Sequence, residues 1–338
     1  MVEAQFYDTL DEGRVRCTLC PHFCLLKEGE TGLCGVRRNV DGRLMSLVYG
    51  QAAALHVDPI EKKPLFHVLP GSRSFSMATV GCNFKCVFCQ NSDISQVKAG
   101  ASVSRYAREI APVEIVTMAQ EQRCDSIAYT YTEPTIYYEY AYECCRLAHE
   151  QNMLNVFVSN GYINPEPLNL ISPFLDGANI DLKSFRNDFY TEFIGAKLNP
   201  VLDTIKLMKK LNIWVEVTSL VIPGKNDSEE DMRDIARFIK QEAGVETPWH
   251  ISRFHPSYQM QDIPPTPLGT LQRARGIGLE EGLRYVYTGN VAGDDGESTF
   301  CYSCNELLIK RYGFQLLENN IKEAKCRYCG APIDGIMR

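Results

Sequence analysis

Three cysteines with the spacing Cys82-x3-Cys86-x2-Cys89 are the residues of this chain best suited to chemistry. Three thiolates in one short loop can each bind one iron of a cubane cluster, and no fourth cysteine follows at ferredoxin spacing. The fourth iron is therefore expected to stay open to another ligand. A structural zinc site normally has four protein ligands, and a disulfide framework needs an even number of cysteines. The spacing thus predicts a reactive metal centre, and the alternative is a three-cysteine zinc loop or chance.

The stretch from Ser76 to Asn91 resembles the signature of the radical S-adenosylmethionine (SAM) enzymes, in which an aromatic residue, here Phe88, precedes the last cysteine. The continuation Gln90-Asn91 resembles the branch that contains the activating enzymes of glycyl-radical enzymes such as pyruvate formate-lyase. Within that branch, residues 17–24 and 57–67 resemble the radical SAM proteins that are named for occurring beside AMMECR1-like and Memo-like proteins. The two named protein types are therefore candidate partners.

This resemblance implies a partial (β/α)6 barrel, a [4Fe-4S] cluster and SAM, whose amino and carboxylate groups would bind the open iron. Phe88 would pack near the adenine, although a core position is the alternative for this ring. The resemblance also implies a low-potential electron donor of flavodoxin or ferredoxin type. Reductive cleavage of SAM would yield methionine and a 5′-deoxyadenosyl radical that abstracts hydrogen from an unidentified small-molecule or protein substrate.

The totals of the sequence limit the other classes of function. With 338 residues, the chain fits one large domain with appendages. Its formal net charge of −7 argues against nucleic-acid binding. The first residues are polar and acidic, and no apolar run approaches ~18 residues, so we expect no signal peptide, no membrane association and a cytoplasmic protein. In a reducing cytoplasm, the fourteen cysteines favour thiolate ligation over disulfides.

The chain divides into four predicted parts: a cysteine-rich N-terminal module at 1–48, a connecting segment at 49–74, the radical SAM partial barrel at 75–297 and a zinc-ribbon-like module at 298–338. Prolines follow Asp58, Lys63 and Leu69 in the connecting segment, which predicts irregular backbone there. We expect this segment to lie against the mouth of the barrel.

Both ends of the chain carry four cysteines. The N-terminal set is Cys17, Cys20, Cys24 and Cys34, in a glycine-rich stretch too small to fold easily without metal. Zinc and an auxiliary iron-sulfur cluster both satisfy these ligands, the spacing does not choose between them, and free thiols are the third possibility. His22 is expected to be exposed.

The C-terminal set is Cys301, Cys304, Cys326 and Cys329, two Cys-x2-Cys pairs with a glycine after the second, which predicts a structural zinc ribbon. A rubredoxin-like iron centre is the alternative, because tetrahedral sulfur ligation suits both metals. The remaining cysteines, Cys124, Cys144 and Cys145, are expected in the core.

The middle of the chain alternates β-rich and amphipathic helical runs, which predicts an α/β fold with a parallel sheet. Predicted strands are 75–80, 126–130, 154–158, 177–182, 213–220, 249–254 and 284–287, and predicted helices are 113–121, 134–151, 200–211, 229–243 and 266–281. Active sites of such sheets lie beyond the carboxyl ends of the strands.

Polar residues follow these strands at places where the resemblance assigns SAM contacts. Glu133 follows the second strand and would meet the SAM ammonium, although Tyr131-Thr132 replaces the two glycines usual before this acid. Ser159 and Asn160 follow the third strand and could bind a carboxylate or ribose, or form a simple turn. Val158 stands where several activases carry an acidic residue, which weakens the case for a cation site.

Asp181 and Lys183 end the fourth strand on one face, where they match the zwitterionic SAM or simply pair with each other. Glu216 and Thr218 share a face of the fifth strand and are candidates for ribose contacts, and a buried carboxylate at Glu216 would need a partner. His255 follows the sixth strand and by resemblance lies near the adenosine.

Three hypotheses follow. The first is a radical SAM enzyme with a small or peptidic substrate. The second is a glycyl-radical activase whose N-terminal module carries auxiliary clusters. The third is an iron-sulfur and zinc adaptor or electron carrier without turnover, which the acidic and basic residues at the strand ends argue against.

Overall fold

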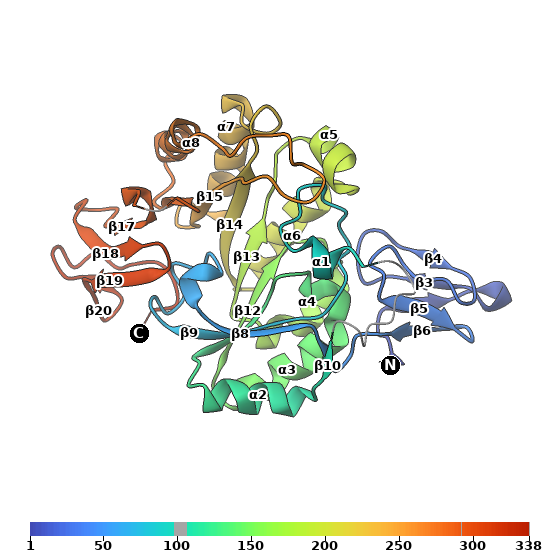
Figure 1. Ribbon diagram of the computed structural model, residues 1–338. Helices are drawn as coiled ribbons and strands as arrows, with labels where there is room; N and C mark the ends of the chain where they lie inside the picture. Colours follow the sequence, from blue (N-terminus) through green and yellow to red (C-terminus); the bar gives the residue numbers. More distant parts are fainter. Residues whose placement is uncertain (98–106, 292, 338) are drawn as a thin grey trace.

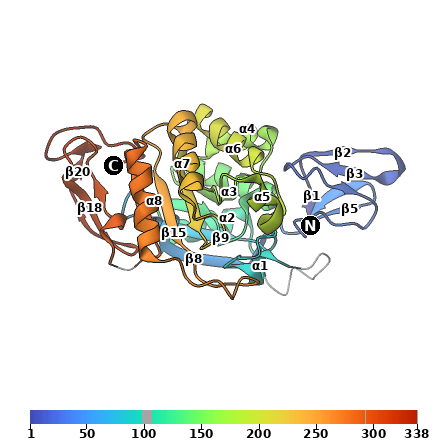
Figure 2. The same ribbon diagram turned by 90° about the horizontal axis from the view of Figure 1, so that it is seen from above.

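The structure, a computed structural model, describes residues 1–97, 107–291 and 293–337. A central sheet covered by helices forms the body of the molecule, and two small β-rich modules flank it (Figure 1). The N-terminal module and the C-terminal module lie at opposite ends of this body in both views (Figures 1 and 2). The α/β architecture predicted from the sequence is confirmed.

The central sheet has eight strands in the order β16-β15-β14-β13-β12-β11-β9-β8. The seven strands from β9 to β16 in this order run parallel, and β8 pairs antiparallel with β9 at one edge. Their bounds are β8 Ala54–Pro59, β9 Arg73–Ala78, β11 Ser126–Tyr129, β12 Leu154–Ser159, β13 Gly177–Asp181, β14 Trp214–Val221, β15 Trp249–Arg253 and β16 Val286–Gly289. All seven predicted strands are therefore present, with small shifts at their ends.

Helices follow the parallel strands and cover one face of the sheet (Figure 2). They are α2 Pro112–Glu121, α3 Tyr138–Glu150, α4 Pro165–Ile171, α6 Asn199–Lys210, α7 Glu229–Phe238 and α8 Leu268–Glu280, with the short α1 Ser92–Ser95 and α5 Asn187–Phe189 in loops. The buried side of α6 shows why it packs there: Val201, Thr204, Ile205 and Met208 recur at helical spacing. The five predicted helices are present, and α4 and α5 were missed because each is short.

The connecting segment differs from the prediction. Instead of irregular chain it contains β8, whose six residues pair with β9 along its whole length. Proline is tolerated at Pro59 because it ends an edge strand, where no ladder hydrogen bond is lost. Of the three prolines in the segment, Pro59 ends the strand, and Pro64 and Pro70 lie in the stretch between β8 and β9.

Residues 60–69, which we call the plug segment, run from β8 into the space beside the strands. Asn179 of β13 donates to the Pro64 carbonyl at 2.7 Å, and Val68 packs on Gly177 at the start of the same strand. The segment therefore descends from the middle of the sheet toward its amino end. Its buried side chains Ile60, Leu65 and Val68 form a small core with Ala128 and Val156.

The flanking modules are built from short antiparallel strands. The N-terminal module holds the sheets β1-β6-β5 and β2-β3-β4, and the C-terminal module holds the sheet β17-β18-β19 and the hairpin β20-β21. Their bounds are β1 Val2–Glu3, β2 Tyr7–Thr9, β3 Val15–Cys17, β4 Leu25–Leu26, β5 Arg37–Val40, β6 Arg43–Ser46, β17 Thr299–Phe300, β18 Leu307–Tyr312, β19 Gln315–Asn319, β20 Ile321–Lys322 and β21 Lys325–Cys326. The final residues return to the body, where Ile336 forms a parallel bridge with Val68 of the plug segment.

Candidate functional site

A cavity of about 420 Å³ opens at the carboxyl ends of the parallel strands. Cys82, Cys86 and Cys89, which follow β9, all line it. Cys86 is buried and the other two are partly exposed, so the three thiols face a space that a ligand can enter. The structure thus brings the three-cysteine loop to the edge of the sheet where the sequence placed the site.

The loop is held in place by its neighbours. The Phe84 N–H donates to the Cys82 sulfur at 3.4 Å, and the Asn160 side-chain amide lies 3.8 Å from the same sulfur. The sulfur of Cys89 lies 3.1 Å from the Ser95 hydroxyl. Hydrogen bonds to sulfur stabilise the thiolate form that binds metal, so this loop fits a cluster held by three thiolates.

Asp181 and Lys183 line the same cavity and form an ion pair of 2.9 Å. Burial by itself lowers the pKa of Lys183, but the Asp181 carboxylate and the nearby Cys86 outweigh it and raise that pKa. Lys183 is therefore a permanent cation at the cavity wall, and its Nζ lies 5.8 Å from the centre of the Phe88 ring. The two charges do pair with each other, and both still border the cavity.

Ser159, Asn160 and Thr218 also line the cavity. Thr218 is 8% exposed, and its hydroxyl has no hydrogen-bond partner within the described residues. A buried hydroxyl without a partner is costly, and a ligand in the cavity would supply one. Together with the Asp181–Lys183 ion pair, this unpaired hydroxyl of Thr218 makes the cavity suitable for a polar ligand such as SAM.

Glu133 lies beneath these residues and outside the lining of the cavity. Its fully buried carboxylate accepts from the Thr135 N–H and hydroxyl, from the Ser159 hydroxyl and from the Asn160 N–H, at 2.7 to 3.0 Å. Burial raises the pKa of Glu133, and these donors oppose that rise. In this structure the carboxylate orients Ser159 and Asn160, and its contact with a ligand ammonium stays a prediction.

Glu216 also lies outside the lining of the cavity. It shares a face with Thr218, as strand alternation requires, but lies two residues nearer the amino end of β14. There it accepts from the N–H groups of Phe66 and His67, at 3.0 and 2.8 Å, and contacts the His250 ring at 2.6 Å. The plug segment separates Glu216 from the cavity, so the carboxylate anchors the segment.

His255 is exposed and, among the described residues, it is not part of the cavity lining. It follows β15 directly before a proline, and the chain there turns outward. Two other polar residues from the last strands, Ser252 and Asn290, line the cavity and bond to each other at 2.8 Å. Sequence analysis singled out neither of them.

A charged cluster borders the cavity on the side of the plug segment. The Asp58 carboxylate contacts Lys62 and Lys63 at 2.8 and 2.7 Å and also accepts from the Tyr131 hydroxyl. Burial lowers the pKa of Lys63 to about 8, and the contact with Asp58 opposes this effect. Lys62, Lys63 and Tyr131 all line the cavity, so a cationic patch faces whatever enters it.

Tyr131 has a φ of 63°, in the left-handed region that favours glycine. The backbone therefore keeps the geometry of a glycine-containing turn although the glycines are replaced. Its carbonyl accepts from Asn91 at 2.8 Å, which ties the turn to the end of the cluster loop. Phe314 of the C-terminal module also lines the cavity, and no local pattern in the sequence could have indicated that contact.

The C-terminal cysteines form a compact group. Cys301 and Cys329 have sulfurs 3.7 Å apart, and so have Cys304 and Cys326. All four sulfurs lie within 4.8 Å of one another. Four thiolates bound at about 2.3 Å around one tetrahedral ion would be about 3.8 Å apart, so this geometry fits a single metal ion.

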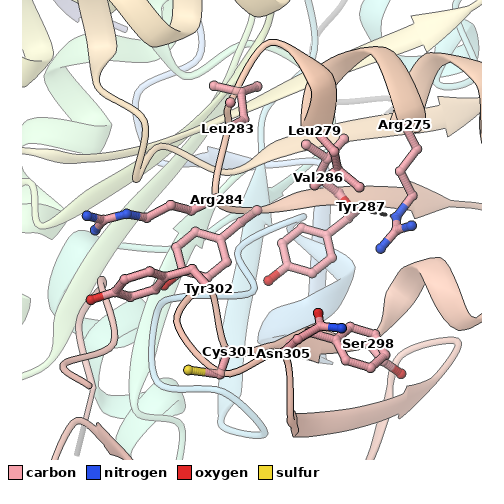
Figure 3. A pocket seen from close by; sticks show the side chains of 13 residues that line it. Arg275, Leu279, Leu283, Arg284, Val286, Tyr287, Ser298, Cys301, Tyr302 and Asn305 are labelled. Atoms are coloured by element: carbon pink, nitrogen blue, oxygen red, sulfur yellow. Dashed lines mark hydrogen bonds between the residues drawn. The ribbon is translucent and has the colours of Figure 1, made fainter. Parts of the chain in front are cut away.

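A second hollow of about 340 Å³ lies between α8, β16 and the C-terminal module (Figure 3). Arg284 stacks on the ring of Tyr302 there, 4.1 Å from its centre. The residues lining this hollow are distinct from those of the main cavity. Tyr287 of β16 lies here and bonds to His67 at 2.7 Å.

His22 differs from the expectation of an exposed residue. Its ring contacts the Asn83 carbonyl at 2.8 Å and packs on Tyr162. Cys144 and Cys145 are fully buried and Cys124 is 8% exposed, as expected for core thiols. No helix in the described part of the chain is long and apolar enough to cross a membrane.

Comparisons with known proteins agree with this geometry. The family described as the radical SAM superfamily matches residues 77–239. An uncharacterized protein of Methanocaldococcus jannaschii is 48% identical over 339 residues, which span 100% of both chains. Pyruvate formate-lyase 1-activating enzyme of Escherichia coli is 21% identical over 64% of this chain and 93% of its own. A radical SAM methyltransferase from Sphaerobacter thermophilus has a similar fold, with a TM-score of 0.52 and 13% identity over 68% of this chain and 70% of that one.

Proposed function

Because the chain belongs to the radical SAM superfamily, we propose that it is an enzyme that holds a [4Fe-4S] cluster on Cys82, Cys86 and Cys89 and cleaves SAM reductively. When bound, the cluster supplies the electron that splits SAM into methionine and a 5′-deoxyadenosyl radical, which takes a hydrogen atom from the substrate. The observation that carries this proposal is that the three thiols line one cavity together with a partly buried ion pair and a hydroxyl that has no partner among the described residues.

The residues of the cavity have distinct roles in this proposal. Asp181 and Lys183 present one negative and one positive charge, which complement the ammonium and carboxylate of SAM. Thr218 supplies a hydroxyl that no other described residue occupies, and Ser159 and Asn160 are oriented by Glu133. Phe88 offers an apolar wall. The proposal requires that the strands and the bound ligand together exclude water, because a reactive radical would otherwise undergo side reactions.

We also propose that the C-terminal cysteines hold a structural zinc ion. The support is the 3.7 Å spacing within both sulfur pairs, which one tetrahedral ion explains. A rubredoxin-like iron centre has the same ligand geometry and is the alternative. Metal analysis of the purified chain distinguishes the two.

For the substrate, we favour a small or peptidic molecule over a glycyl-radical enzyme. The similarity to the Escherichia coli activating enzyme covers 93% of that protein but only 64% of this chain, so about a third of this chain lies outside the shared part. The cationic side chains of Lys62 and Lys63 at the cavity favour a substrate with an anionic group.

The glycyl-radical activase remains the second candidate, and the observation that favours it is that same similarity. It requires a glycyl radical to appear on incubation with a partner enzyme and not without it. A non-catalytic adaptor or electron carrier is the third candidate, and it gives no role to the Asp181–Lys183 pair at the cavity. The donor of flavodoxin or ferredoxin type, the AMMECR1-like and Memo-like partners and the cytoplasmic location remain predictions.

The test is anaerobic reconstitution with iron and sulfide, reduction with dithionite in the presence of SAM, and chromatography for 5′-deoxyadenosine. Metal content is measured on the same sample. Formation of 5′-deoxyadenosine that depends on both the reductant and the three cysteines supports the proposal. A reduced cluster that produces none, also when anionic small molecules and peptides are added, contradicts it and favours the electron carrier.

A further inference from the structure

Four thiols of the N-terminal module line one small, partly open cavity of about 20 Å³, apart from the main cavity. Cys17 ends β3, Cys20 and Cys24 lie in the loop to β4, and Cys34 lies in the turn before β5. All four line the cavity and all are free thiols. Apart from these sulfurs, its walls are largely apolar and include Leu19, Leu26, Leu33 and Ile136. The convergence of four cysteines from separate turns indicates a metal site.

The spacing of these thiols distinguishes the two kinds of metal that the sequence left open. The structure describes all fourteen cysteines, and only the C-terminal four form a group with sulfurs within 4.8 Å of one another. No three of the N-terminal thiols reach that proximity. A single zinc ion requires sulfurs about 3.8 Å apart, because each binds at about 2.3 Å. Thiolates that each bind a different iron of a cubane lie farther apart.

The loop of Cys82, Cys86 and Cys89 behaves in the same way, since its three sulfurs also fail to form such a compact group. Both the N-terminal thiols and the cluster loop therefore differ from the compact C-terminal thiols. The same chain thus contains compact thiols that fit one metal ion, at the C-terminus, and less compact thiols that fit several irons, in the cluster loop.

The cavity also contains a polar group without a partner. Arg37 lines it and is 2% exposed. Two of its nitrogens are held by Glu139, at 2.9 Å each, and one of them also by the Gln5 carbonyl. Its Nε has no hydrogen-bond partner in the described part of the chain. A buried unpaired donor is costly, and a sulfide or thiolate of a cluster would accept from it.

The N-terminal cavity lies against the loop of the main site. A side chain at Gly81 would meet the Cys34 carbonyl at 2.7 Å, and Gly81 directly precedes Cys82. Asn83 lines the N-terminal cavity, whereas Cys82 lines the main cavity. The Asn83 side chain also accepts from Asn160 at 2.8 Å. One short stretch of backbone is therefore the wall between the two sites.

We propose that Cys17, Cys20, Cys24 and Cys34 hold a second [4Fe-4S] cluster, which passes single electrons to the cluster of the main site. The electron comes from a reduced iron-sulfur or flavin protein, which is oxidised by one electron. The N-terminal cluster is reduced by that electron and returns to its oxidised state when it reduces its neighbour. The relay rests on the proposed function, whereas the presence of the cluster does not.

The presence of the cluster is tested in the full chain with Cys82, Cys86 and Cys89 all replaced by alanine. After anaerobic reconstitution, we expect about four irons and about four sulfides per chain, and a paramagnetic signal on reduction with dithionite. Adding Cys20→Ser and Cys34→Ser removes this iron, whereas adding Cys124→Ser leaves it unchanged. The zinc of the C-terminal module and the circular dichroism spectrum report whether each variant is folded.

A folded triple-alanine variant with two zinc ions and no iron overturns the cluster, and so does one with no metal in the N-terminal module. The relay is tested separately by Cys20→Ser with Cys34→Ser in the chain that keeps the main site. SAM cleavage with dithionite should persist, and cleavage with reduced flavodoxin as donor should fall about tenfold or more. Equal rates with flavodoxin overturn the relay. If the unaltered chain cleaves no SAM, the proposed function fails while the iron content still decides the cluster.

Discussion

The two ends of the central sheet use similar residues for opposite purposes. At the carboxyl end, Thr218 faces a cavity and its hydroxyl has no partner within the described residues. At the amino end, Glu216 on the same face of the same strand is fully buried and bonds to Phe66, His67 and His250. On this strand, the hydroxyl without a partner among the described residues lies at the cavity, and the saturated carboxylate holds residues 60–69 in place.

The plug segment explains this difference. Lys62 and Lys63, in its first half, line the cavity. Phe66 and His67, in its second half, bond through their backbone N–H groups to Glu216. Asp334, near the C-terminus, stabilises the later residues of the plug segment. Its backbone carbonyl contacts His67, and its side-chain carboxylate pairs with Arg284 at 2.9 Å. Substitutions at the carboxyl end should therefore change activity, and substitutions at the amino end should change stability.

The largest effect is expected from Cys86→Ala at the carboxyl end. The cluster loses one of three thiolates, so formation of 5′-deoxyadenosine should fall below detection. The zinc of the C-terminal module and the thermal unfolding midpoint of the apo chain should stay unchanged, because the amino end is untouched. Chromatography, metal analysis and calorimetry measure these three quantities. Retained cleavage in Cys86→Ala, with Cys124→Ala as the matched core control, would contradict the assignment of the site.

Cys326→Ala tests the module that supports the amino end. It should release about one zinc per chain and lower the thermal unfolding midpoint, because small modules draw much of their stability from metal. SAM cleavage with dithionite should persist, since the cluster cysteines belong to another part of the fold. Loss of cleavage with zinc retained would show that the two ends are not independent.

Glu216→Gln should lower the free energy of unfolding by about 2 to 3 kcal/mol. The amide nitrogen cannot accept from the N–H groups of Phe66 and His67, so at least one buried donor loses its partner. The dissociation constant of SAM should change little. Denaturant unfolding and equilibrium binding provide the two readings. A variant of normal stability with weak SAM binding would place Glu216 in the ligand site after all.

Thr218→Val gives the opposite pattern on the same strand. Valine keeps the shape and removes a hydroxyl that has no partner among the described residues, so the stability should stay the same or rise slightly. SAM binding should weaken by about tenfold, which corresponds to about 1.4 kcal/mol. Isothermal titration of the anaerobic protein measures it, with Thr191→Val on the exposed surface as the control. Unchanged affinity would remove Thr218 from the proposed contacts.

The smallest effect is a pH dependence at the amino end. Burial lowers the pKa of His67, although Glu216 opposes that effect. Below the ordinary histidine pKa of about 6.5, the unfolded chain therefore binds more protons than the folded chain, and the free energy of unfolding falls as the pH falls. The pKa of Glu216 is lowered as well, so its contribution is present above about pH 4.3 and is lost only at lower pH.

Between pH 7.5 and 5.5, His67→Gln should therefore lose less stability than the unaltered chain. Denaturant midpoints at several pH values measure this difference. The control is His56→Gln, since His56 is exposed on the edge strand β8. Parallel pH profiles for the unaltered chain and His67→Gln would contradict the assignment of the acid sensitivity to His67.

Much of the candidate site was predictable from local sequence. Metal ligands in one loop depend on spacing, so Cys82, Cys86 and Cys89 could be assigned from the order of residues alone. The parallel strands followed from β-rich runs that alternate with helical runs, and period-two alternation gave the shared faces of Asp181 with Lys183 and of Glu216 with Thr218. The predicted residues Asp181, Lys183, Ser159, Asn160 and Thr218 all line the cavity. These features depend on residues close together in the chain, where backbone geometry alone determines which side chains share a side.

Other features depended on contacts between distant parts of the chain. Alternation correctly placed Glu216 and Thr218 on one face of the strand. The plug segment, some 150 residues away in the chain, bonds to Glu216 and leaves the Thr218 hydroxyl without a partner among the described residues. Likewise, Phe314 reaches the cavity and Tyr131 contacts Asp58 only because the tertiary fold brings separate modules together. The sequence determined which residues can do chemistry and on which face they lie. The tertiary structure decided which of them remain unpaired, because burial and hydrogen bonding depend on partners that no local pattern specifies.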